Sequence, residues 1–213
     1  MFFQLVLKGI AGLSRDEADG MFDGGIQCNW WRRVHRITPP EIVDKLTERN
    51  LDWHLNHYDD PDPTMGNAPF SDNTPYISAT AGSVERDTFA RRNIVFDPFL
   101  TALRFATADF TVTGYVFSAY VFTLGRQSIE LSEFAEEVRE LNIYNNFLPY
   151  HPEGEVTAKI EIRGPQIEKW DEYDGPAVLQ DLRQRRVPTP TMTSINTIYA
   201  PPQRYCNIRG LVT

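Results

Sequence analysis

Three short segments of this 213-residue chain hold side chains that could do chemistry. The first contains Arg33, within a stretch, residues 26–37, whose aromatic and β-branched content predicts a strand. A guanidinium inside a sheet needs an anionic partner, because an unpaired buried charge is costly. The second is the predicted strand Tyr76–Thr80, on which Ser78 and Thr80 share one face, since alternate residues of a strand point the same way.

The third segment is Glu153-Gly154-Glu155, which leads straight into a predicted strand over 154–163. Two carboxylates two residues apart can project toward the same side of the chain. Their mutual repulsion raises a pKa and costs free energy. The chain gains no stability from gathering like charges at a strand entrance, so this pair indicates a function.

A possible metal cluster is the next pattern. His54 and His57 are three residues apart, and three aspartates follow them. The surrounding stretch, residues 52–73, is rich in Asp, Pro, Asn and Gly, which predicts a long solvated loop. Metal ligands on one helix face need a helix, so we expect no metal site here. Neither of the common glycine-rich phosphate-binding motifs occurs, and Cys28 is predicted to be a core residue.

The charge balance disfavours some classes of binding partner. The chain has 21 Lys and Arg against 29 Asp and Glu, a formal charge of −8, and so lacks the positive field that holds nucleic acid phosphates. No segment has the roughly 20 apolar residues that cross a bilayer. The apolar start, residues 2–7, predicts a strand or helix packed on the domain rather than a signal peptide. We therefore expect no membrane partner, and either a cytoplasmic protein or an effector exported without a cleaved signal.

The predicted elements lack a regular βαβ alternation, which favours an α+β fold with a mixed or antiparallel sheet. Helices are predicted after Ser14, after Thr38, after Thr80 to about residue 91, from Asp97, and over 131–141. Further strands are predicted over 111–124 and around Trp170. The first of these is apolar on both faces and is predicted to be central to the sheet.

In order and context, the three chemical segments resemble the motifs of the mono-ADP-ribosyltransferase toxins. The resembled class combines an arginine, a Ser-x-[Ser/Thr] strand and a [Glu/Gln]-x-Glu pair, as in the catalytic subunits of pertussis, cholera and CARDS toxins. Residues 32–42 align without a gap with the first motif and place Arg33 on the NAD-binding arginine. The departures from that motif are Arg32, His35, the position of Arg36, and Pro40. A shifted register with Arg32 or Arg36 in this role therefore stays open.

The second and third motifs also match, although Ala79 replaces the family's middle threonine. The resemblance implies a split mixed or antiparallel sheet flanked by helices. It covers residues 29–172 as a catalytic domain, with 1–28 as an N-terminal arm or helix packed on it. Residues 173–213 would form a C-terminal extension of unclear role.

The resemblance also implies roles in handling NAD as the co-substrate, with no metal. Arg33 would clamp the NAD phosphates, a task for a bidentate guanidinium. Ser78 would orient Glu155, and Thr80 would support both. Glu155 would bind the 2′-hydroxyl of the nicotinamide ribose and stabilise the positive charge that develops as nicotinamide leaves.

On the acceptor side, the resemblance gives Glu153 the task of orienting or deprotonating the nucleophile, and Phe147 and Tyr150 that of contacting the target. In this family a glutamate at position 153 accompanies arginine acceptors, so a protein arginine is the favoured target and nucleic acid a less favoured one. Transfer to water by an NAD glycohydrolase, modification of nucleic acid, and a degenerate domain that only binds a partner remain alternatives. An immunity or inhibitor protein stays open as a further partner.

Overall fold

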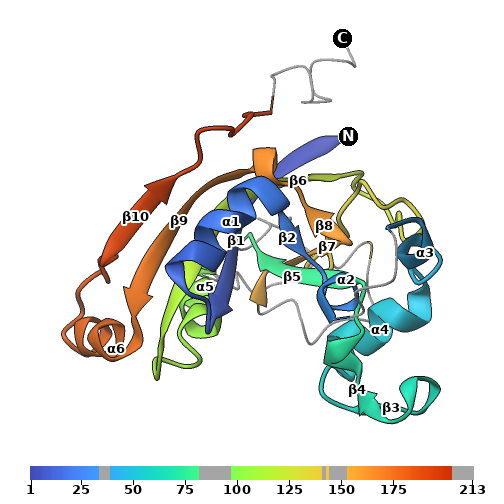
Figure 1. The fold of residues 1–213 in the computed structure, drawn as a ribbon, viewed down its shortest axis with the longest axis horizontal. Helices are drawn as coiled ribbons and strands as arrows, with labels where there is room; N and C mark the ends of the chain where they lie inside the picture. Colours follow the sequence, from blue (N-terminus) through green and yellow to red (C-terminus); the bar gives the residue numbers. More distant parts are fainter. Residues whose placement is uncertain (34–38, 82–96, 141–142, 144–152, 203–213) are drawn as a thin grey trace, which may run out of the picture.

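The computed structural model describes residues 1–33, 39–81, 97–140, 143 and 153–202 (Figure 1). Its main layer is a six-stranded sheet with the order β10-β9-β6-β1-β5-β7, in which all the paired strands are antiparallel. These strands are β1 (Phe2–Ala11), β5 (Tyr76–Thr80), β6 (Thr113–Thr123), β7 (Glu155–Lys159), β9 (Ile167–Asp174) and β10 (Met192–Ile195). The predicted α+β fold with an antiparallel sheet is confirmed.

Helices and short strands surround this sheet. The helices are α1 (Arg15–Gly24), α2 (Asn29–Arg33), α3 (Pro39–Val43), α4 (Glu48–Asn56), α5 (Pro98–Ala106) and α6 (Gly175–Arg183). Two small ribbons pair β2 (Ile26–Gln27) with β8 (Glu161–Ile162), and β3 (Pro61–Asp62) with β4 (Ala68–Pro69). In Figure 1, α3, α4, β3 and β4 gather at one end of the molecule, and β9, β10 and α6 lie at the other. No helix in the described ranges has the length and apolar character that crossing a bilayer requires.

The N-terminal segment forms β1, an interior strand of the sheet. It registers with β6 over its full length, from Phe2 opposite Thr123 to Ala11 opposite Gly114. On its other side it meets β5 at a single registered pair, Leu7 with Thr80. The sheet therefore includes strands from the predicted N-terminal arm, the predicted catalytic domain and the predicted C-terminal extension.

Helix α5 lies directly on β1 and β6, because two glycines leave no side chain between them. A Cβ added at Gly9 would stand 2.1 Å from the carbonyl oxygen of Ala102, and one at Gly114 would stand 1.7 Å from that of Ala106. Asp97 begins the helix, and its carboxylate accepts hydrogen bonds from two backbone amides of the first turn. The predicted helix start at Asp97 is thus confirmed, and this helix forms one wall of the cavity described below.

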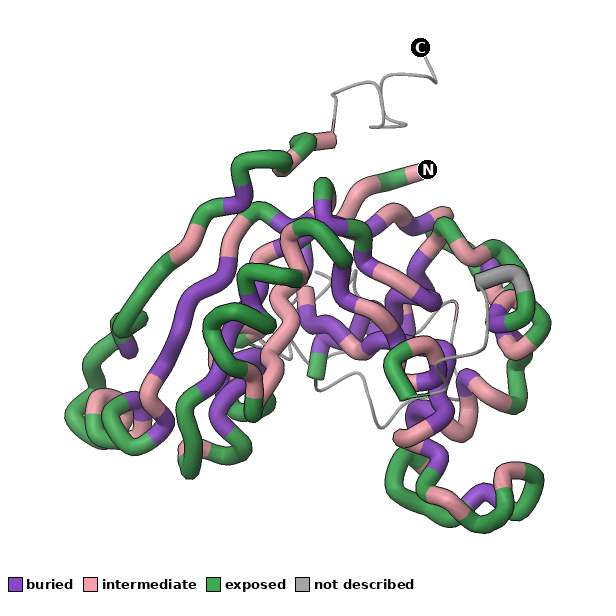
Figure 2. The backbone as a smooth tube through the Cα atoms, viewed as in Figure 1, coloured by how far each residue is buried: buried purple, intermediate pink, exposed green. Residues whose placement is uncertain are grey.

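The core lies between the sheet and the outer elements. Its largest fully buried side chains include Trp170, Tyr76, Phe70 and Phe117. The indole nitrogen of Trp170 donates to Asp19 of α1 at 2.9 Å, so this ring is both packed and hydrogen-bonded. Figure 2 shows the burial concentrated along the interior strands, whereas β10 at the sheet edge is largely exposed.

Two predicted elements are wrong. The predicted strand over 26–37 ends at Gln27, because the backbone amide of Trp30 donates to the carbonyl of Thr74 and the chain turns into α2. The predicted helix over 131–141 is absent from its described residues, 131–140, which form turns and one bridge from Glu136 to Thr157. A fully buried ion pair between Glu136 and Lys159, at 2.6 Å, draws this segment onto β7.

The predicted loop over 52–73 is partly wrong, since α4 continues to Asn56. The side chain of Thr47 caps this helix, and Leu51, His54 and Leu55 form its buried stripe. The helix predicted to follow Thr80 lies outside the described residues. The predicted strands over 76–80 and 111–124, and the one around Trp170, are present as β5, β6 and β9.

We expect Gly114→Ala to destabilise the fold by at least about 1–3 kcal/mol, because the added methyl group must displace helix α5. Gly20→Ala is the matched control. Gly20 lies within α1 with no atom near its would-be Cβ, so alanine there should stabilise the chain by up to about 1 kcal/mol. Urea unfolding of both variants measures the effect. Equal stability of the two would contradict the close contact of α5 with the sheet.

Candidate functional site

A cavity of about 250 Å³ opens where β1 and β5 meet at their single registered pair. Its walls come from β1, β5, α4 and α5, with the start of β7. The polar side chains in its lining are Lys8, His54, Tyr58, Ser78, Thr80, Thr101, Glu153 and Glu155. The structure therefore brings together the second and third chemical segments of the sequence.

Glu155 is the most deeply placed carboxyl of this cavity, with 4% of its surface exposed. Burial raises its pKa from 4.5 to about 7, because the charged form loses its hydration. Hydrogen bonds from the hydroxyl groups of Ser78 and Thr157 act against this shift, and the Thr157 bond is 3.0 Å long. Near neutral pH the carboxyl is therefore divided between its two protonation states.

His54 continues this network on the other side of Ser78. Its Nε2 lies 2.9 Å from the Ser78 hydroxyl, and its Nδ1 lies 2.8 Å from the Thr74 hydroxyl. Burial lowers the pKa of His54 to about 3, so the imidazole is neutral and carries one proton.

The bonds around it assign that proton. When Glu155 is ionised its carboxylate can only accept, so Ser78 donates to it and accepts from His54, which places the His54 proton on Nε2. Thr74 then donates to Nδ1, and its own oxygen accepts from the amide of Tyr76. The result is a directed chain of donors from Thr74 through His54 and Ser78 to Glu155.

The turn before β7 positions the second carboxylate, that of Glu153. The Thr80 hydroxyl donates to the carbonyl of Glu153 at 2.7 Å, and the amide of Ala81 donates to that of Gly154 at 3.0 Å. Gly154 adopts φ +60°, a conformation that favours glycine. Glu153 is exposed while Glu155 is buried, so the pair lines the cavity at two depths.

The outer edge of β7 is also hydrogen-bonded to the rest of the chain. The backbone of Glu136 exchanges hydrogen bonds with Thr157, and the amide of Arg139 donates to the carbonyl of Glu155 at 3.0 Å. On its inner edge β7 registers with β5, where Thr80 lies opposite Glu155. The backbone that carries Glu155 is thus bonded on both sides.

The structure does not bring Arg33 into this cavity. Arg33 lies on α2, is exposed, and forms an ion pair with Asp72. Arg32, on the same helix, is also absent from the cavity lining. Arg36, Phe147 and Tyr150 lie outside the described residues, so the roles implied for them stay predictions.

Lys8 and His54 are among the cavity residues that the sequence did not assign to this site. Lys8 interrupts the apolar run of β1, and a lone cation in an apolar strand was the available signal for it. His54 shares the helical stripe of Leu51 and Leu55, a spacing that indicates a buried face. The prediction of a solvated loop is wrong for His54 but fits His57, which is partly exposed, follows the last residue of α4 and pairs with Asp60.

Two partly exposed aromatic rings also line the cavity. Tyr58 and Phe105 line the cavity with 40% and 56% of their surfaces exposed. Within the described ranges, no group of three or more His, Cys, Asp or Glu side chains could hold a metal ion.

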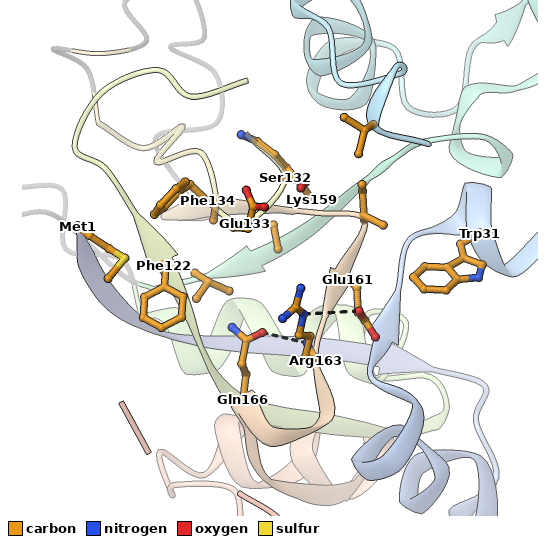
Figure 3. Close-up of a pocket in the computed structure, with 15 residues that line it drawn as sticks. Met1, Trp31, Phe122, Ser132, Glu133, Phe134, Lys159, Glu161, Arg163 and Gln166 are labelled. Carbon is orange, nitrogen blue, oxygen red and sulfur yellow. Dashed lines mark hydrogen bonds and ion pairs between the residues drawn. The ribbon is translucent and has the colours of Figure 1, made fainter. Parts of the chain in front are cut away.

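A larger cavity, of about 700 Å³, lies elsewhere, between Trp31 and the rings of Phe122 and Phe134 (Figure 3). Lys159 reaches its wall but is already bonded to Glu136 and to the carbonyl of Ser128. The chemically equipped cavity is therefore the smaller one, because its carboxyl is buried without a directly bonded cation.

Comparison with known proteins does not assign the chain to a family. No family model matches the chain, and no curated protein matches it. Among solved structures, EcPltA is similar with a TM-score of 0.48 and 12% sequence identity, over 94% of this chain and 89% of that chain. What this chain does must therefore be inferred from the chemistry of its cavity.

The raised pKa of Glu155 makes a prediction about stability. A carboxyl whose pKa rises on folding favours the folded state when protonated, and this contribution is lost as the pH rises through the folded-state pKa. Between pH 4.5 and 8, wild type should lose about 3 kcal/mol from this group, and Glu155→Gln should not. Urea unfolding at both pH values measures the difference. The exposed control Glu130→Gln should follow wild type, and a Glu155→Gln variant that also follows it would refute the burial.

Proposed function

We propose that the chain is an NAD-dependent mono-ADP-ribosyltransferase that modifies a side chain of a target protein. The observation that carries this proposal is the buried Glu155, aimed into a cavity and hydrogen-bonded by Ser78. Ser78 is in turn oriented by the neutral His54. A carboxylate held in this way suits the stabilisation of a positive charge that exists only during the reaction.

The reaction begins with the bond between C1′ of the nicotinamide ribose and the pyridine nitrogen. When that bond breaks, its electron pair leaves with nicotinamide, which becomes neutral, and the ribose carries an oxocarbenium-like charge. Glu155 stabilises this charge and accepts a hydrogen bond from the ribose 2′-hydroxyl. Glycosidases use a carboxylate beside an oxocarbenium in the same way.

The acceptor then forms the new bond to C1′. For an arginine acceptor, a guanidinium nitrogen supplies the electron pair and loses a proton, and Glu153 is the base that takes it. Its exposure at the entrance suits this role, because a side chain of a large target can reach it without entering the cavity. Tyr58 and Phe105 offer aromatic faces on which a flat ring of the dinucleotide can stack.

The size of the cavity is compatible with part of the dinucleotide. A volume of about 250 Å³ is small for a complete cofactor, since ligand pockets usually reach 300–1,000 Å³. We therefore assign to it the nicotinamide ribose and the adjoining phosphates. The rest of NAD would extend toward the exposed aromatic rings.

The first test is release of nicotinamide from NAD, with and without candidate acceptors. Wild type should release it, and Glu155→Gln should be slower by about 10²–10³-fold or more, because the developing charge loses its carboxylate. Glu130→Gln serves as the matched control. Equal slow release by wild type and Glu155→Gln would refute the proposal.

The fate of labelled ADP-ribose separates the remaining activities. Label on protein supports the transferase, and loss of that label after arginine side chains are blocked identifies the acceptor. Label on DNA or RNA would instead identify a nucleic-acid-modifying enzyme. Free ADP-ribose alone, whatever acceptor is added, would identify an NAD glycohydrolase.

The pH dependence of kcat/KM gives a further prediction. Glu155 must be ionised to act, so kcat/KM should rise through the pKa of this carboxyl, about 7. Ser78→Ala removes a hydrogen bond to the carboxylate form, which raises that pKa and moves the rising limb to higher pH. Ser194→Ala, far along the chain on β10, is the control and should leave the limb in place. An unmoved limb in Ser78→Ala would contradict the network.

A further inference from the structure

Lys8 is the one lysine of the described chain whose ammonium group has no structural partner. Lys159 is paired with Glu136, Lys169 is paired with Asp171, and Lys45 lies over the Trp30 ring. No hydrogen bond or ion pair within the described ranges involves the Lys8 ammonium, which lines the same cavity as Ser78 and Glu155.

Lys8 is half-buried, and an unpaired ammonium that has lost part of its hydration is costly to the fold. Burial lowers the pKa of Lys8 to about 8, while the charge of Glu155 acts to raise it and that of Arg32 to lower it. A methionine or leucine here would continue the apolar run of β1 without that cost. A lysine whose charge weakens the fold and faces a cavity is well placed to bind an anionic ligand.

We propose that Lys8 binds the pyrophosphate of the dinucleotide, the task that the sequence motif implies for Arg33. The identity of the anion, the pyrophosphate of NAD, rests on the proposed function. The position of Lys8 in the cavity does not depend on that function. Lys8 lies next to Leu7, where β1 and β5 meet, and it shares the cavity with the carboxyl that would face the ribose. The ribose and its phosphates are adjacent in NAD, so one small cavity can serve both.

The alternative cations are less well placed. The guanidinium of Arg33 is engaged by Asp72 and is exposed to solvent. Neither it nor Arg32 lines the cavity. Lysine supplies a compact charge with three donors, which suits phosphate oxygens without the bidentate geometry of arginine.

A lysine in this role also titrates, whereas an arginine does not. The charged or titratable groups around it are Glu155 on β7, Glu153 just before that strand, Arg32 on α2, the neutral His54 on α4, and Tyr58 after that helix. The cavity residues from α5 and β5 carry no charge. Affinity for the phosphates should therefore fall above about pH 8, where the free ammonium loses its proton.

Calorimetric binding of ADP-ribose and of inorganic pyrophosphate tests the inference without any turnover. At pH 7, Lys8→Met should weaken ADP-ribose binding by about 10-fold or more, the loss of a charged hydrogen-bond donor, and Lys8→Arg should largely restore it. The alkaline fall should disappear in Lys8→Arg. Arg33→Met is the matched control and should bind as wild type does. Thermal unfolding checks that Lys8→Met is folded, since it replaces an unpaired charge by an apolar chain.

Three outcomes overturn the inference: Lys8→Met binds as tightly as wild type, Arg33→Met rather than Lys8→Met loses binding, or wild type binds neither ligand. Failure of this inference differs from failure of the proposed function. If wild type releases nicotinamide and Lys8→Met has an unchanged KM for NAD, only the role of Lys8 is refuted. If ADP-ribose binds through Lys8 but wild type never releases nicotinamide, only the transferase is refuted.

Discussion

The burial of one carboxyl is the constraint around which this molecule is arranged. Glu155 lies almost wholly out of water, and without partners its charged form would be strongly disfavoured. Hydroxyl groups of Ser78 and Thr157 donate to it, and His54 orients the first of them. The donors recover part of the lost hydration but not all of it, which is why the pKa remains raised.

Holding that carboxyl requires elements from most of the chain. Strand β7 carries it, β5 supplies Ser78, and α4 supplies His54. Strand β1 adds Lys8 to the lining of the cavity, and α5 closes it because glycines at positions 9 and 114 let the helix contact the sheet. The site is therefore a product of tertiary structure, although its central residues come from two short motifs.

This origin explains how much of the molecule is predictable from its sequence. Ser78, Thr80 and Glu155 belong to local patterns, and strand pairing between β5 and β7 brings them together as expected. The α2 helix was predicted as a strand, because local β propensity says nothing of the hydrogen bond from Trp30 to Thr74 that turns the chain. The sequence places His54 in a solvated loop for a similar reason, since the residues around it are polar while Thr47 and the Leu51 stripe make a helix. Lys8 belongs to no sequence motif. Its place in the cavity follows only from the position of β1 inside the sheet.

A carbon-13 NMR titration of the Glu155 side-chain carboxyl tests the burial of this group most directly. The signal can be assigned by its disappearance in Glu155→Gln. We expect a midpoint near pH 7, because burial raises the pKa of this carboxyl and its hydroxyl donors lower it again in part. A midpoint near the ordinary value of 4.5 would mean that the carboxyl is solvated, and would contradict the site on which both the proposed chemistry and the role of Lys8 are built.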